Sequence, residues 1–125
     1  MYKILLLIFL GGGLGSIFRY LSQVLVNKWI SIHFPLGTLA VNIVGSFLIG
    51  IALALLGNNQ HHVMRFLFVI GFCGGFTTFS TFSYDSVVLL KEADYLLFGL
   101  NVLGNVVLCI LSTIAGLLLA KNLFL

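Results

Sequence analysis

Residues 63–90 of the chain read VMRFLFVIGFCGGFTTFSTFSYDSVVLL. This stretch is long and apolar enough to cross the roughly 30 Å hydrocarbon layer of a bilayer, for which a helix needs about 20 mostly apolar residues. Its middle holds two adjacent glycines and then five hydroxyl residues within seven positions, and both features disfavour a continuous helix. A break near Gly74–Thr78 would free backbone carbonyls, which a membrane tolerates only where protein, an ion or water satisfies them. We therefore predict a membrane-spanning helix that is broken near its middle.

Apolar residues dominate the rest of the chain as well. Of its 125 residues, 61% are hydrophobic and 7% are charged, whereas a soluble domain carries about 25% charged residues. The apolar runs are continuous, which favours helices over the alternating strands of a membrane β-barrel. We predict an all-α integral membrane protein that forms a single transmembrane domain over residues 1–125. Its four spans are expected at about residues 4–30, 36–56, 63–90 and 96–120.

The basic residues are divided almost evenly between the two sides of the membrane. With four spans, three of them lie on the side of both termini (Lys3, Arg65 and Lys121) and two on the other (Lys28 and Lys91), which is almost no bias under the positive-inside rule. Either an outside factor sets the orientation, or both orientations occur and pair. Because four helices are few for enclosing a polar pathway, we favour an antiparallel, dual-topology dimer in which the two copies act as inverted repeats. The thinly spread charge makes nucleic acid an unexpected partner.

Two polar side chains lie deep in the first two spans. Arg19 places a charge where it costs about 2.5–3.5 kcal/mol on insertion scales, so it is either an anchor satisfied by backbone carbonyls or a cation beside an anion path. Asn42 needs hydrogen-bond partners, and its amide either joins two helices or offers N–H donors to an anion. The glycines of residues 11–15 and 45–50 are best explained by close helix packing.

The broken third span combines oxygen donors with aromatic rings. Carbonyl and hydroxyl oxygens at the break suit a hard cation such as Na⁺. Phenylalanine recurs every three residues, at Phe76, Phe79 and Phe82, and such a stripe is usually helix packing. Because an aromatic ring has a positive edge, ring edges and the interleaved hydroxyls can also replace water around a small anion. The composition permits such a charge-free anion path without showing one.

Three segments resemble the CrcB/Fluc family of fluoride channels. They are GGGLGSIFR at Gly11–Arg19, GTLAVN at Gly37–Asn42 and the long, compositionally unusual GGFTTFSTFS at Gly74–Ser83. The resemblance covers essentially the whole chain. It implies a non-enzymatic, fluoride-selective channel of the bacterial plasma (inner) membrane, surrounded by lipid, that passively exports F⁻ from the cytoplasm and so gives fluoride resistance. It also implies an antiparallel homodimer with two pores and a central structural Na⁺.

The resemblance further assigns roles to individual residues. Phe79 and Phe82 would line the pores with their ring edges, and Asn42 would donate a hydrogen bond to fluoride. The Na⁺ would be held by the backbone carbonyls of Gly74 and Thr77 from each subunit. The remaining implied site residues are Ser80, Thr113 and, as a weaker member, Thr38 in a polar track, Arg19 as the first-span arginine, and Asp85 near the pore mouth.

A proton-coupled exporter of the small multidrug type is the alternative, since such exporters also have four spans and dual topology. They need a carboxylate at membrane depth. Glu92 and Asp94 fall in a predicted loop, and Asp85 lies about 13 Å along a helix beyond the break, close to the interface. The positions of these carboxylates argue against the exporter.

The two cysteines offer no catalytic or metal-binding pattern. Cys73 and Cys109 lie in apolar runs, where a free thiol acts as a small apolar side chain. Cys109 stands where relatives often carry a serine, and a thiol is a weaker hydrogen-bond donor than a hydroxyl. This substitution bears on the polar track of the fourth span.

Overall fold

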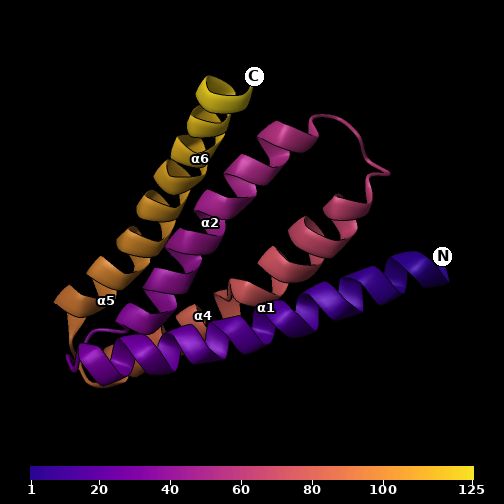
Figure 1. Cartoon of the computed structure of the whole chain (residues 1–125). Coiled ribbons are helices and arrows are strands. Elements are labelled where there is room, and N and C mark those ends of the chain that lie inside the picture. Colours follow the sequence, from indigo (N-terminus) through magenta and orange to yellow (C-terminus); the bar gives the residue numbers. More distant parts are fainter.

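A computed structural model describes all 125 residues of the chain as helices joined by short loops (Figure 1). Four helical rods are each long and apolar enough to cross a membrane, and the third is bent, as predicted. In chain order the elements are α1 (Tyr2–Trp29), α2 (Leu36–Leu56), the π-helical η1 (Arg65–Cys73), α3 (Gly74–Phe76), α4 (Phe79–Lys91), α5 (Tyr95–Leu103), the π-helical η2 (Gly104–Leu108) and α6 (Cys109–Phe124).

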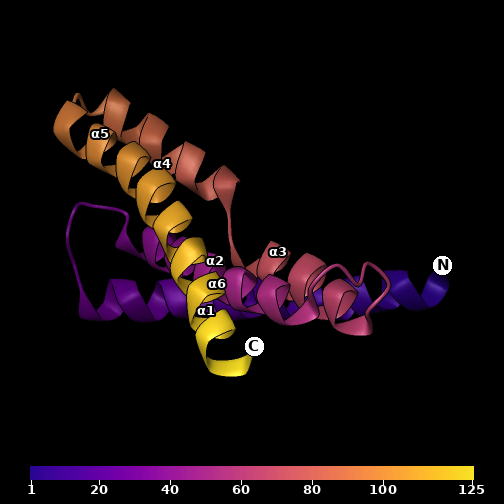
Figure 2. The ribbon, with the colours of Figure 1, turned by 90° about the horizontal axis from the view of Figure 1, so that it is seen from above.

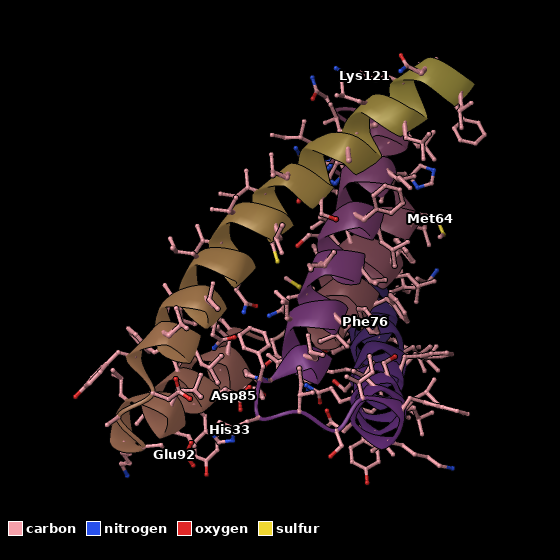
Figure 3. All side chains as sticks on the ribbon, turned by 90° about the vertical axis from the view of Figure 1, so that its left-hand side faces the viewer. His33, Met64, Phe76, Asp85, Glu92 and Lys121 are labelled. Atoms are coloured by element: carbon pink, nitrogen blue, oxygen red, sulfur yellow. The ribbon has the colours of Figure 1, made fainter.

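The loops alternate between the two ends of the molecule. Residues 30–35 join α1 to α2 and residues 92–94 join α4 to α5, and both loops lie at one end. The two termini and residues 57–64 lie away from that end (Figure 1). Figure 3 shows the same separation in side chains, because His33 and Glu92 gather at one end and Lys121 lies at the other. The chain therefore crosses from end to end four times.

Two helix pairs form the body of the molecule, and both pack through glycines. α1 lies along η1, and α2 lies along α6 (Figure 1). A Cβ atom on Gly15 would overlap the backbone carbonyl of Phe72 in η1, and one on Gly50 would overlap that of Thr113 in α6. Small residues allow such close approach of backbones in membranes. The packing interpretation is confirmed for Gly11, Gly15 and Gly50, whereas Gly13 has open space around it.

The third rod is interrupted at Thr77 and Thr78. Thr77 has φ −82° and ψ 156°, and Thr78 has φ −149° and ψ 116°, so both are extended. Thr78 then caps α4, since its hydroxyl accepts a hydrogen bond from the backbone N–H of Thr81 at 3.2 Å. Figure 2 shows the extended connection leaving α3 and α4 turning away from the line of η1 and α1. The predicted break is confirmed, and it is two residues long.

Most of the apolar surface faces outward. Only 21 of the 125 residues are buried, and large apolar side chains are exposed along all four rods. Exposure of so large a continuous apolar surface to water is unfavourable, so lipid or another protein chain is expected to cover it. The few residues that are buried include six polar ones: Thr38, Asn42, Thr78, Ser86, Asn101 and Asn105. Of these, Asn42, Thr78 and Asn105 lie beside the break in the third rod.

Candidate functional site

A cleft of about 640 Å³ lies beside the break. α2 and the η2–α6 segment form one side of it, and η1, the break and α4 form the other. Its lining is mainly apolar and contains no charged side chain. Of the site residues expected from the sequence, the cleft brings together Asn42, Gly74, Thr77, Phe79 and Phe82.

Asn42 bridges the break. Its side-chain oxygen accepts a hydrogen bond from the backbone N–H of Thr78 at 2.8 Å, and its nitrogen donates to the carbonyl of the same residue at 3.1 Å. The nitrogen also donates to Oδ1 of Asn105 at 2.9 Å. Both N–H bonds of the Asn42 amide are therefore used inside the chain. Two roles were considered for Asn42, joining two helices and donating to an anion. The hydrogen bonds observed here join helices. To donate to an ion, the amide would have to give up one of these hydrogen bonds.

The aromatic stripe divides at the break. Phe76 stacks on Phe72, with ring centroids 5.7 Å apart and ring planes within 10°, so it belongs to helix packing. Phe79 and Phe82 have ring centroids 5.3 Å apart and are tilted by 59°. Phe82 is 8% exposed, whereas Phe79 is 77% exposed at the open side of the cleft. These two rings are thus set apart from the packing stack and stand together in the cleft.

A second, polar cleft of about 450 Å³ lies at the end of the molecule that holds His33, Asp85 and Glu92 (Figure 3). There the hydroxyl of Thr38 donates to Oδ2 of Asp85 at 2.8 Å. His33 and Glu92 pair at 2.6 Å across its rim and join the two loops of this end. Because Thr38 and Asn42 are four residues apart on α2, they share a helix face, and the two clefts follow one another along that face.

Three expected site residues line neither cleft. Ser80 is exposed, and its hydroxyl lies 3.2 Å from that of Thr78. Thr113 donates to the carbonyl of Cys109 at 3.0 Å, within its own helix. Arg19 is partly exposed and makes no hydrogen bond or ion pair within the chain. The single chain therefore does not bring these residues together with the cleft at the break.

Comparison with known proteins places the chain in a family. Residues 6–117 match the family described as CrcB-like protein, Camphor Resistance (CrcB). The chain belongs to the CrcB family. It is 51% identical over 106 residues to a protein of Gloeothece citriformis, and the aligned region covers 80% of this chain and 83% of that protein. It is 46% identical over 122 residues to a protein of Phocaeicola vulgatus, and the aligned region covers 95% of this chain and 99% of that protein.

Both of these CrcB relatives are named "Fluoride-specific ion channel FluC". The predicted resemblance is confirmed, and so is the prediction of a non-enzymatic protein, since the relatives are named as ion channels. Together with four apolar rods, membership of the CrcB family makes this chain a multi-pass membrane protein.

The break in this CrcB chain leaves several carbonyls without their usual helical donors, among them those of Gly74 and Thr77. In a continuous helix, Gly74 would accept from the N–H of Thr78, and Thr77 would accept from that of Thr81. Here Asn42 takes the first N–H at 2.8 Å, and the hydroxyl of Thr78 takes the second at 3.2 Å. Uncharged carbonyl oxygens are the donors that a hard monovalent cation prefers. The two residues expected to hold Na⁺ therefore fit such an ion chemically.

Sequence reasoning missed the buried asparagines of the fourth rod. Asn101 and Asn105 are 0% and 7% exposed, and Asn105 is the direct partner of Asn42. The sequence could have indicated them, because two primary amides four residues apart lie on one helix face and each needs a hydrogen-bond partner at membrane depth. Cys109 lines the cleft one further turn along the same face.

Proposed function

We propose that the chain is a fluoride-selective channel through which F⁻ leaves the cytoplasm passively. The observation that carries this proposal is the uncharged cleft at the break, in which the tilted pair of Phe79 and Phe82 stands beside Asn42. The names of its CrcB relatives supply the ion. Hydrofluoric acid enters acidified cells as a neutral molecule and dissociates at cytoplasmic pH, so an open path for F⁻ is enough to remove it.

In this proposal, selectivity arises from dehydration. The positive edges of the two rings and nearby side-chain donors replace water around the ion. A narrow path of this kind compensates the lost hydration only for an ion small enough to touch all donors at once, which excludes Cl⁻. From the break, the path follows the shared face of α2 from Asn42 toward Thr38 and the polar cleft at Asp85.

The proposed assembly is an antiparallel homodimer in the bacterial plasma membrane. The cleft is open on one side, where Phe79 is exposed, and a second copy would close it. The near absence of charge bias between the two sides allows both orientations. A Na⁺ at the dimer centre would be held by the carbonyls of Gly74 and Thr77 from each copy and would fix the two breaks against one another.

The exporter alternative has little support from the acidic residues. Asp85 lies midway along α4 and lines the polar cleft with His33 and Glu92 (Figure 3). Its carboxylate accepts a hydrogen bond from Thr38. A proton-coupled exporter needs its carboxylate at the middle of the membrane, and no acidic residue lines the cleft at the break.

Anion release from liposomes tests the function. Vesicles loaded with KF or KCl and containing purified protein are opened to K⁺ movement by valinomycin, and external F⁻ and Cl⁻ are measured with selective electrodes. We expect fast F⁻ release that requires valinomycin, together with negligible Cl⁻ release. Equal release of both anions, or proton-driven drug transport without an F⁻ current, would refute the proposal.

A further inference from the structure

Buried side chains form one continuous chain of hydrogen bonds from α2 to α4. Asn42 donates to Oδ1 of Asn105 at 2.9 Å, and Asn105 donates to Oδ1 of Asn101 at 3.1 Å. Asn101 then donates to the hydroxyl of Ser86 at 3.0 Å, and Ser86 donates to the backbone carbonyl of Phe82 at 2.8 Å. We call these four polar side chains, Asn42, Asn105, Asn101 and Ser86, the amide relay. Each of them is at most 9% exposed.

Backbone groups fix the direction of the amide relay at both ends. The N–H of Thr78 can only donate, so the Asn42 atom 2.8 Å from it is the oxygen, and the nitrogen of that amide faces Asn105. At the other end the carbonyl of Phe82 can only accept, so the Ser86 hydroxyl donates to it and accepts from the next amide. Reversing one member would leave a buried donor without an acceptor. All hydrogen bonds of the relay therefore run in one direction, with donation passing from Asn42 toward the carbonyl of Phe82.

Both ends of the amide relay are attached to the same helical turn. It begins at Thr78, the residue before α4, and it ends at the carbonyl of Phe82 in the first turn of α4. The rings of Phe79 and Phe82 are carried by this turn. A loss of one link would free the turn at one end, and the tilt of the ring pair would no longer be fixed by α5 and η2.

We propose that Asn105 and Asn101 are positioning residues, which hold the ring pair and the Asn42 amide in place without touching the ion. The inference rests on the proposed fluoride channel, whose selectivity requires a fixed ring pair. It differs from simple helix packing, because it assigns the effect to the orientation of hydrogen bonds and not to the volume of the side chain.

A pair of equal-volume variants separates orientation from packing. In Asn105→Thr the new hydroxyl can accept from Asn42, which keeps the link that orients the Asn42 amide, and donate to the carbonyl of Asn101 four residues back, as Thr113 does to Cys109 at 3.0 Å, so that only the bond to Oδ1 of Asn101 is lost. Asn105→Val has the same shape without the hydroxyl. We expect the valine variant to lose about tenfold in F⁻ flux per reconstituted protein, equivalent to about 1.4 kcal/mol, and the threonine variant to stay within about threefold of the wild type.

The control removes a hydrogen bond of the same helix pair that lies outside the relay. Ser112 in α6 donates to the carbonyl of Ile43 in α2 at 2.8 Å, and we expect Ser112→Ala to stay within about twofold of wild-type flux. If the valine variant does not fold, Asn105→Ser and Asn105→Ala form a second matched pair with the same expected order. Equal flux from the hydroxyl and apolar members of either pair would overturn the inference.

A second readout does not depend on transport. In detergent micelles, the side-chain N–H signals of Asn42 should exchange slowly with water in the wild type and in Asn105→Thr. They should exchange at least about tenfold faster in Asn105→Val. If the wild type releases no F⁻, the channel proposal fails while this exchange comparison still decides the relay. Unchanged exchange in the valine variant would overturn the relay even if the channel proposal stands.

Discussion

The substitution Asn42→Leu should destabilise the fold strongly, because it removes the bridge across the break while nearly keeping the side-chain volume. Three hydrogen bonds are lost, two with the backbone of Thr78 and one with Asn105. Side-chain hydrogen bonds between membrane helices contribute about 0.6 kcal/mol on average and about 1.7 kcal/mol at most. Losing all three should therefore lower the free energy of unfolding by about 2–5 kcal/mol. The upper part of this range is favoured, because Thr78 is 5% exposed and its backbone groups would be left buried without partners.

The measurement is an equilibrium unfolding titration with sodium dodecyl sulfate in mixed micelles, followed by circular dichroism. Ser112→Ala is the control, because it removes one hydrogen bond between α2 and α6, and it should cost about 0.6–1.7 kcal/mol. A loss for Asn42→Leu no larger than that of the control would refute the reasoning. In that case the extended geometry of Thr77 and Thr78 would have to be held by the backbone and by helix packing alone.

The remaining predictions concern the rings, the glycine contacts and the cation. Phe82→Ile should lower F⁻ flux by about tenfold or more, because an aliphatic side chain has no positive edge, and it should leave the proposed dimer assembled in gel filtration; unchanged flux would remove the ring-edge hypothesis. Gly50→Ala should cost about 1–3 kcal/mol of stability, because its Cβ would overlap an α6 carbonyl, whereas Gly13→Ala, with open space around it, should cost nothing measurable in the same titration. Replacing Na⁺ by N-methylglucamine during purification should lower the thermal midpoint of the protein, with recovery on adding Na⁺, if the carbonyls of Gly74 and Thr77 hold that ion. A midpoint independent of Na⁺ would contradict the cation site.

The sequence was sufficient to predict the helices and the break. Continuous apolar runs specify spans through length alone, and adjacent glycines followed by hydroxyl residues marked the break to within a few positions of Thr77 and Thr78. The sequence did not reveal what closes the break, because the partner of Asn42 lies in a distant rod. Asn105 is 63 residues away along the chain. Only the pairing of α2 with the fourth rod decides that the two amides meet.

The site residues that lie outside both clefts show a second limit of prediction from the sequence. Ser80 and Thr113 carry hydroxyls at suitable membrane depth, but a helix also fixes the direction in which each side chain points. Ser80 points out of the chain, and the hydroxyl of Thr113 is bonded within its own helix. A pattern of polar residues therefore predicts depth reliably, whereas it predicts convergence on one site only when the packing of the helices is also known.

In the proposed channel, the break would allow one segment to serve a cation and an anion at once. Three of its N–H groups are occupied: Thr77 donates to the carbonyl of Cys73 at 3.0 Å, Thr78 donates to Asn42, and Thr81 donates to the hydroxyl of Thr78. The first half-helix ends in released carbonyls, which attract a cation at its negative end. The second half-helix presents its positive end to the break and carries both rings in its first turn. An anion at this depth can draw on the first-turn N–H groups of α4 as well as on ring edges and side chains, and Asn42 holds Thr78 in place between the two half-helices.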